Sequence, residues 1–404
     1  MMNDITHCAS NLRRRQTFCQ ENRPMQDSAC SLPHYSLIDL GTLAGGSVSE
    51  ATAINNLNQV VGWSNLGSGQ QEDRRVDKSS FRHGFLWAEG RLCDLNPEDG
   101  VDIRLPRGIN DAGTVVGNLF PLGAASRSFC VRVDGTEVGP LAGVHRAEAI
   151  NTRGCIAGAC IDATDTVQTV LVLPGSERKS PPDFRPMRLE ADLYGGSVRA
   201  INDRNEGAGF AMVGRAAGQE IKQAVYWQAD GMGCAIFTDA EAVTASMATG
   251  INARGQIVGY RDTPRQGHRE IRTAFLRTAH GTIVTLPTLP GAKQSEACGI
   301  NETAQVVGAS GNRAFLWSLA HGTTDLNDLL PCQYRLDPHP RERDQFRRRD
   351  YRAGTLPGTA PGLSCTALYS GRAARVAVSV RVSLPRCTTI LTMSPGLCPD
   401  SATV

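Results

Sequence analysis

Hydrophobic residues in the middle of the chain fall into short runs that are separated by polar turns, and no segment keeps a helical period. An Ile-Asn pair marks one of these turns and recurs six times, with spacings of 55, 41, 51, 50 and 49 residues. The pairs begin at Ile54, Ile109, Ile150, Ile201, Ile251 and Ile300. Self-similarity at this period is typical of repeat architectures. The pattern therefore predicts one β-rich module that is copied along residues 34–331.

Each Ile-Asn pair sits between an apolar or small residue and a short β-branched run that ends in glycine, as in AINNLNQVVGW and GINARGQIVGY. An Asn side chain can open a tight turn by accepting hydrogen bonds from backbone amides two residues on. A residue that tolerates a positive φ follows at Gly113, Gly154, Asn205 and Gly255. This is the chemistry of a β-hairpin with a type I turn and a bulge.

A second apolar strand follows each hairpin, as in GFLW at Gly84–Trp87, AVYW at Ala224–Trp227 and AFLW at Ala314–Trp317. A turn and a fourth strand come next, most clearly at Arg91–Leu95. Four short antiparallel strands in about 50 residues describe a propeller blade better than a sandwich. A solenoid is the main rival, although its usual periods are shorter. We therefore predict an all-β fold, a β-propeller of four-stranded blades, with about seven blades and the last one incomplete.

The string Ile38–Leu43, followed by Gly45-Gly46-Ser47 and then by the AxxIN, VVG and FLW motifs, resembles the bacterial HAF repeat, which is described as an extracellular repeat. The resemblance covers roughly residues 35–331, although the first element survives fully only at Ile38–Leu43. It implies a repeat scaffold that is secreted or displayed at the cell surface. It supplies no catalytic residue.

The two ends of the chain differ from the repeats. Residues 1–33 contain Arg13-Arg14-Arg15 but no apolar stretch after them, so no signal peptide is recognised and a disordered leader is expected. Residues 332–404 are rich in arginine and are expected to form a disordered tail. The orphan strand Ser36–Leu40 could complete the last blade of a closed ring.

A frameshift would explain the tail. A seventh Ile-Asn hairpin is due near residue 345 or 350, where the chain instead carries an Arg-rich segment. Read one base downstream from Glu342, permitted codons give SAINSAGAIIGQGHSQGQRRAFLA, which restores the AIN, IIG and AFL motifs in order. We therefore interpret residues 332–404 as out-of-frame translation that begins between Pro331 and Glu342. The alternative is a natural Arg-rich linker with a Cys-bearing extension.

The distribution of net charge along the chain bears on whether the protein binds nucleic acid. The chain carries a formal net charge of +2, of which +1 lies in residues 1–33 and +6 in residues 332–404, so residues 34–331 carry −5. A mildly acidic body argues against a nucleic-acid partner, which is bound through neutralised phosphates. No run approaches the length of an apolar membrane span.

Candidate chemistry is sparse, and no catalytic, cofactor-binding or metal-binding residue is assigned, so no cofactor is expected. No P-loop, GxSxG, HExxH or CxxC motif occurs. His280 and His321 precede glycine in equivalent turns, which favours a turn preference over a ring of ligands. The pair Cys155 and Cys160 lacks histidine partners and is interpreted as two small residues in a sheet.

Two other sets of residues recur in register. The acidic residues Asp111, Asp203 and Glu302 follow Ile-Asn pairs and alternate with Asn56, Thr152 and Ala253, so solvated turns are favoured over a calcium circle. The tryptophans Trp87, Trp227 and Trp317 occupy matching strand positions, which favours packing between blades, whereas Trp63 is the better candidate for a surface aromatic.

Two functions from different classes remain. The preferred one is a non-enzymatic repeat scaffold, extracellular by resemblance, that binds an unknown protein or glycan through the loops at one end of the propeller. The alternative is a propeller-based hydrolase or lyase whose catalytic groups lie in the long loops Gly67–Arg82, Ser176–Met187 or Arg261–Arg272. Propellers support both uses, so the fold does not decide between them.

Overall fold

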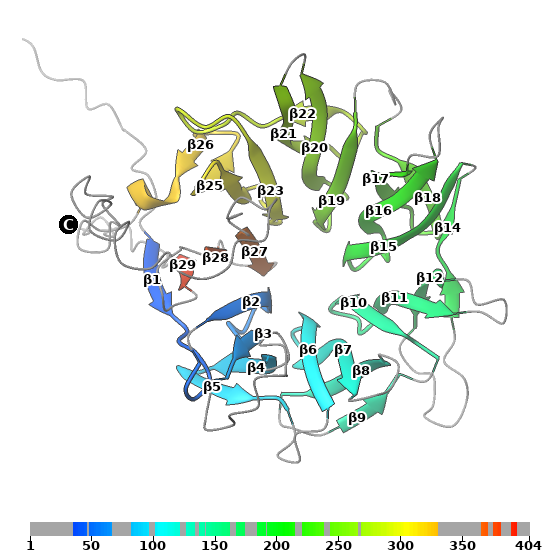
Figure 1. Ribbon diagram of the computed structural model, residues 1–404, viewed down its shortest axis with the longest axis vertical. Coiled ribbons are helices and arrows are strands. Elements are labelled where there is room, and N and C mark those ends of the chain that lie inside the picture. Colours follow the sequence, from blue (N-terminus) through cyan, green and yellow to red (C-terminus); the bar gives the residue numbers. More distant parts are fainter. Residues whose placement is uncertain are drawn as a thin grey trace, which may run out of the picture. The chain divides into compact units, whose positions relative to one another are not determined.

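The protein is a β-propeller with six four-stranded antiparallel blades arranged in a ring, viewed down its centre in Figure 1. The computed structural model describes residues 35–46, 48–66, 82–96, 102–121, 127–133, 137–141, 143–161, 167–173, 184–190, 192–214, 220–237, 243–265, 268–329, 365–370, 375–380 and 389–393. No helix in these ranges is long and apolar enough to cross a membrane. The predicted all-β propeller is therefore confirmed.

The blades follow one another along the chain, and the first strand of each lies nearest the centre in Figure 1. Blade 1 is β2 (Ser49–Ile54), β3 (Val60–Asn65), β4 (Arg82–Ala88) and β5 (Arg91–Asp94). Blade 2 is β6 (Asp102–Ile109), β7 (Thr114–Pro121), β8 (Arg127–Arg132) and β9 (Glu137–Pro140). Blade 3 is β10 (Arg146–Ile150), β11 (Ile156–Ile161), β12 (Val167–Val172) and β13 (Phe184–Pro186).

The second half of the ring repeats this order. Blade 4 is β15 (Leu193–Ile201), β16 (Gly207–Gly214), β17 (Glu220–Trp227) and β18 (Met232–Ala235), to which the short strand β14 (Arg188–Leu189) adds in parallel. Blade 5 is β19 (Ala245–Ile251), β20 (Ile257–Arg265), β21 (His268–Arg277) and β22 (Ile283–Thr285). Blade 6 is β23 (Ser295–Ile300), β24 (Val306–Ser310), β25 (Arg313–Ser318) and β26 (Gly322–Asp325), followed by the 3-10 helix η3 (Leu326–Leu329).

The prediction of about seven blades was too high, because the described residues form six four-stranded blades. No seventh Ile-Asn turn is present in the chain as written, and the four remaining strands form two separate pairs. One pair is β27 (Cys365–Ser370) with β28 (Arg375–Val380). The other joins the expected orphan strand, β1 (Tyr35–Asp39), to β29 (Thr389–Met393) in antiparallel register.

The interpretations of both chain ends remain predictions. Residues 1–33, the expected leader, lie outside the described residues. Within the expected tail at 332–404 the structure describes β27, β28 and β29, and the rest of that range lies outside the described residues. The proposed frame change between Pro331 and Glu342 also falls outside them, and sequencing of the gene will decide it.

The Ile-Asn pair closes the first hairpin of every blade, as the sequence predicted. In blade 1 the Asn55 amide donates to the Gln59 carbonyl, and the Asn58 amide donates back to the Asn55 carbonyl. The fourth residue of the turn takes a positive φ in all six copies. These residues are Asn58, Gly113, Gly154, Asn205, Gly255 and Ala304. Ala304 adopts φ 61° without the freedom of glycine, so the turn of blade 6 carries local strain.

A β-bulge two residues before the isoleucine interrupts every first strand, and a glycine faces it from the second strand. A Cβ added to Gly259 would lie 2.0 Å from the Met247 carbonyl oxygen, and one added to Gly62 would lie 2.1 Å from the Glu50 carbonyl oxygen. The same clash, at 2.0–2.3 Å, recurs at Gly117, Gly158, Gly209 and Gly308. The glycine that ends each β-branched run therefore allows the bulged strand to approach its neighbour.

Hydrophobic clusters fill the spaces between neighbouring blades. Trp227 is fully buried in a cluster that includes Ala149 and Cys155 of blade 3. Trp317 packs with Val258 and Leu276 of blade 5, which agrees with the predicted packing between blades. Trp87 instead packs against a cluster that contains Leu40 and Leu43, ahead of blade 1. Trp63, the expected surface aromatic, is half-buried, and the Arg82 guanidinium lies 4.3 Å from its ring centroid.

We predict that Gly259→Ala lowers the free energy of unfolding by about 1–3 kcal/mol, the usual range for overpacking. The reason is that the added Cβ meets backbone atoms, which cannot move aside. Gly214→Ala is the matched control, since a Cβ there meets nothing within 4 Å. Chemical denaturation followed by circular dichroism measures both variants. Equal stability of the two variants would contradict the role of the close approach.

Candidate functional site

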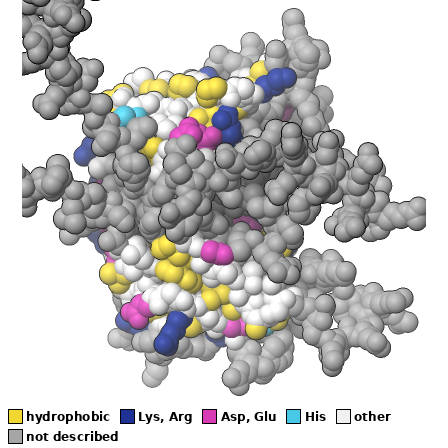
Figure 2. Space-filling model, turned by 90° about the vertical axis from the view of Figure 1, so that its left-hand side faces the viewer, with side chains coloured by type: hydrophobic (Ala, Val, Ile, Leu, Met, Phe, Trp, Pro, Cys, Tyr) yellow, Lys and Arg dark blue, Asp and Glu magenta, His cyan; other side chains and the backbone are white. Residues whose placement is uncertain are grey.

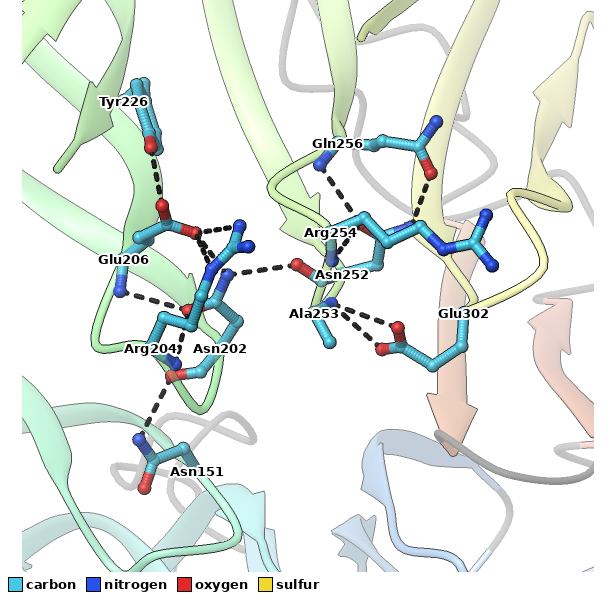
Figure 3. A network of polar contacts seen from close by, with 10 residues as sticks. All are labelled: Asn151, Asn202, Arg204, Glu206, Tyr226, Asn252, Ala253, Arg254, Gln256 and Glu302. Carbon is cyan, nitrogen blue, oxygen red and sulfur yellow. Dashed lines mark hydrogen bonds and ion pairs between the residues drawn. The ribbon is translucent and has the colours of Figure 1, made fainter. Parts of the chain in front are cut away.

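Six asparagine side chains form a ladder that joins the blades around the centre of the ring. The amide nitrogen Nδ2 of Asn55 donates to the Asn110 carbonyl at 3.0 Å, and the Asn110 Nδ2 donates to the Asn151 carbonyl at 3.3 Å. The same bond continues from Asn151 to Asn202, from Asn202 to Asn252 and from Asn252 to Asn301, at 3.0, 3.0 and 2.9 Å. Figure 3 shows the bonds from Asn151 to Asn202 and from Asn202 to Asn252. One hydrogen bond thus links each described blade to the next.

The side-chain oxygens of the Asn ladder hold the turns themselves. The Asn252 Oδ1 accepts from the backbone amides of Arg254 and Gln256, and its second amide hydrogen goes to Gln256 Oε1. The Asn55 and Asn301 side chains make the matching bonds in their own turns. All six ladder side chains are buried, with at most 6% exposed. The oxygen and the NH2 group of these buried side chains are both hydrogen-bonded. This arrangement orders the turn strongly, because a buried donor or acceptor that is left unpaired carries its full desolvation cost.

A cavity of about 650 Å³ opens at the end of the propeller that carries the Asn ladder. Its wall contains one isoleucine from each of the first five blades, and its rim consists of the residues that follow the ladder asparagines. The rim residues are Asn56, Asp111, Thr152, Asp203, Ala253 and Glu302. Ile150, Ile201 and Ile251 are partly exposed, so blades 3–5 present apolar surface to this cavity. We call this space the central cavity.

The acidic rim residues accept hydrogen bonds from the turn of the preceding blade, a contact that the expectation of solvated turns did not include. Asp111 accepts from the Asn56 backbone amide at 2.8 Å and from Asn56 Nδ2 at 2.6 Å. Asp203 accepts from the Thr152 backbone amide at 3.0 Å and from Thr152 Oγ1 at 2.6 Å. The alternation that argued against a calcium circle is therefore a donor-acceptor pairing between adjacent turns.

The third rim pair differs from the other two. The Ala253 backbone amide donates to both oxygens of Glu302, at 3.0 and 3.1 Å (Figure 3). Alanine has no side-chain donor, so the Glu302 carboxylate receives one N–H from this turn where Asp111 and Asp203 each receive two donors. Glu302 is half-buried and lines the central cavity.

The bulged residues of the first strands join the same blades a second time. The Thr52 hydroxyl donates to the Pro106 carbonyl between blades 1 and 2, and the Thr249 hydroxyl donates to the Ala297 carbonyl between blades 5 and 6. Between blades 3 and 4 the corresponding contact is an ion pair of 3.6 Å from Arg199 to Glu148. Rim pairs and bulge contacts thus both fall at the junctions 1–2, 3–4 and 5–6, so these two kinds of contact repeat at every second junction.

A charged network replaces the usual glutamine in the turn of blade 4 (Figure 3). Glu206 accepts from Asn202 at 2.6 Å, from Arg204 at 2.7 Å and from the Tyr226 hydroxyl at 2.8 Å. Burial acts to raise the pKa of Glu206, but these donors outweigh it and hold the pKa below its ordinary value. Burial and the bond to Glu206 raise the pKa of Tyr226 to about 12. At neutral pH the pair is therefore a carboxylate that accepts a hydrogen bond from a protonated phenol.

The other sequence candidates lie apart from the central cavity. Gly281 and Gly322, which follow His280 and His321, take positive φ in turns, as expected for a turn preference. Cys155 is buried, Cys160 is half-buried, and burial raises the pKa of the Cys155 thiol. Among the described residues no group of three His, Cys, Asp or Glu could hold a metal ion.

The long loops proposed to carry catalytic groups are described only in part. Residues 67–81 and 176–183 lie outside the described residues. The loop Arg261–Arg272 forms the outer part of the β20–β21 hairpin, where Arg272 makes a bidentate ion pair with Asp262 and a third bond to Glu296 of blade 6. The Arg272 guanidinium also lies 3.8 Å from the centroid of the Tyr260 ring.

The donor role of the Asn ladder could have been found in the sequence. Aspartate opens such turns as well as asparagine does, because only an acceptor oxygen is needed for that task. Asparagine nevertheless occupies all six positions. A position that admits only the amide indicates a donor, and the partner of that donor is the next copy of the module.

Comparisons with known proteins give distant similarity alone. No family model and no curated protein matches the chain. The chain is similar to the gluconolactonase XC5397 from Xanthomonas campestris, with 10% identity over 91% of this chain and 93% of that one and a TM-score of 0.39. It is also similar to the β-propeller domain of the Trilobed protease from Pyrococcus furiosus, with 10% identity over 90% and 100% and a TM-score of 0.44. A third similar structure is a catalytically inactive virginiamycin B lyase from Staphylococcus aureus with quinupristin, with 8% identity over 89% and 100% and a TM-score of 0.48.

We predict that Asn252→Ala lowers the free energy of unfolding by about 2–4 kcal/mol, because the part-buried amides of Arg254 and Gln256 lose their acceptor and the bond to the Asn301 carbonyl is lost. Arg254→Ala in the same turn is the control, since its exposed side chain forms no hydrogen bond or ion pair with the described residues. Thermal and chemical unfolding measure both variants. A loss of similar size in the control would argue against the ladder.

A double-mutant cycle tests the pairing of blades. Thr152→Ala and Asp203→Ala should be coupled by about 1 kcal/mol in the free energy of unfolding, because the two side chains bond directly across the junction of blades 3 and 4. Thr152→Ala and Asp111→Ala form the matched cycle across the junction of blades 2 and 3, where no such bond joins the two residues, and should add without coupling. Equal coupling in both cycles would refute the paired arrangement.

Proposed function

We propose that this protein is a non-enzymatic repeat scaffold that binds a protein or glycan partner at the central cavity. The observation that carries the proposal is the cavity itself, which combines an apolar wall of isoleucines with a polar rim at one end of the ring. Ligand sites in proteins are commonly concave and mostly apolar, with a few placed polar groups that fix orientation.

Two of the three rim carboxylates, Asp111 and Asp203, stabilise the scaffold. Asp111 and Asp203 each hold a backbone amide and a side-chain donor of the preceding turn. A general acid or base must exchange a proton with its substrate, and a carboxylate engaged in this way is committed to structure. This favours binding over the alternative of a propeller-based hydrolase or lyase.

The charge of the molecule is consistent with a selective partner site. On the flank seen in Figure 2, acidic and basic side chains are interspersed among polar and hydrophobic ones. The rim of the central cavity differs from this mixed surface, because its charged members are all acidic. The resemblance to the HAF repeat adds the proposal that the scaffold acts outside the cell or at its surface.

We predict that Ala253→Trp abolishes partner binding while the fold is retained. Ala253 is exposed on the rim and contributes a backbone amide to the contact with Glu302, so the substitution fills the cavity mouth and leaves that bond in place. The measurement is binding of the full-length chain to a glycan array and to a displayed peptide library. Arg153→Trp, at an exposed neighbouring turn position outside the cavity lining, is the control. Ligands that bind both variants as well as the unsubstituted protein would overturn the proposal.

A further inference from the structure

The three rim pairs are structurally equivalent, and comparing them isolates one position in the central cavity. Asp111 and Asp203 each receive a side-chain donor from the blade before, namely Asn56 Nδ2 and Thr152 Oγ1 at 2.6 Å. At the third pair this donor is missing because Ala253 stands in the place of Asn56 and Thr152. Glu302 therefore keeps acceptor capacity on the side where its two counterparts are occupied, and both Ala253 and Glu302 line the cavity.

A carboxylate accepts hydrogen bonds at about four lone-pair sites. Both Glu302 oxygens share the single Ala253 amide hydrogen, at 3.0 and 3.1 Å. The nearby Arg254 forms no ion pair with Glu302 in the described part of the chain, although it is exposed and belongs to the same turn as Ala253. Among the described residues, no basic side chain forms an ion pair with Glu302 in place of the missing donor.

The surroundings of Glu302 select the chemistry of a ligand. The described lining of the cavity includes three carboxylates and no Lys, Arg or His, so a cation is favoured over a neutral hydroxyl group. The partly exposed Ile150, Ile201 and Ile251 supply apolar wall to the cavity, and Ile251 lies two residues before Ala253 in the chain. An aliphatic chain fits this wall, and a terminal ammonium has N–H donors for the open side of the carboxylate.

We propose that the central cavity binds an aliphatic chain with a primary ammonium group, and that Glu302 accepts the ammonium where Asn56 and Thr152 supply the donor in the other two pairs. The inference rests on the proposed function, since it names the ligand class of the same cavity. A lysine side chain of a partner protein and a free aliphatic amine share this chemistry.

The test uses full-length protein and two probes, 1,5-diaminopentane and the peptide acetyl-Gly-Lys-Gly-amide, with binding measured by saturation-transfer NMR and calorimetry. Binding of the diamine alone identifies a free amine as the source, and binding of the peptide identifies a lysine side chain. Both outcomes support the ammonium site. 1-Pentanol and the acetyl-lysine peptide are the neutral controls, and binding of these controls as tight as that of the amines would overturn it.

Two variants locate the site. Glu302→Gln should weaken amine binding at least tenfold because it removes the charge. Ala253→Thr should do the same, because its hydroxyl would donate to Glu302 as the Thr152 hydroxyl donates to Asp203. Ala253→Thr adds a contact between blades, so it should raise the melting temperature while binding is lost, which separates site occupation from misfolding. Glu89→Gln removes an exposed carboxylate outside the cavity and should change the affinity less than twofold.

The failures are distinguishable. If neither probe binds, or if Glu89→Gln weakens binding as much as Glu302→Gln does, the ammonium site is wrong. In that case a partner from the glycan or peptide screen that is still lost on Ala253→Trp leaves the proposed function standing. If Ala253→Trp leaves every ligand bound, the proposed function itself falls.

Discussion

The hydrogen bond from each ladder asparagine to the next blade is the interaction on which the rest of the structure depends. It is the one polar contact that recurs at all five junctions between the described blades. Because the donor belongs to the first hairpin turn, the bond fixes the turn and the neighbouring blade in a single step. The bulge in the first strand and the glycine that faces it bring the backbones of that hairpin close together. The same asparagine side chain thus stabilises its own turn and joins neighbouring blades.

A second set of contacts occurs at every second junction between blades. Side-chain contacts at the rim and at the bulges occur together at the junctions 1–2, 3–4 and 5–6. The pattern of these contacts therefore repeats every two blades, although the sequence repeat is one blade long. This arrangement places one carboxylate in every second blade and spaces the three acidic groups around the central cavity.

The pair formed by Ala253 and Glu302 differs from the other two rim pairs, because it lacks the side-chain donor. In the other two pairs the donor and acceptor satisfy one another within the protein. Here the acceptor faces the cavity with one N–H for two oxygens. Such departures from an internal repeat are informative because the remaining copies show what a purely structural version of the position contains. The isoleucine wall and the acidic rim together give the cavity an amphipathic character that the surface flank of mixed charge lacks.

The sequence by itself determined the fold class, the module and its turns, because a period of two along strands and a fixed turn signature are local properties. The asparagine of the turn and the glycine that faces the bulge were visible in every copy, whereas the positive-φ residue was recognised at Gly113, Gly154, Asn205 and Gly255 but not at Asn58 or Ala304. Tertiary structure alone decided the number of complete blades, the carbonyl group to which each ladder asparagine donates, and the partners of Asp111, Asp203 and Glu302. Those features depend on which residues of neighbouring blades meet, and residues some 50 positions apart in the chain are brought within hydrogen-bonding distance only when the ring assembles.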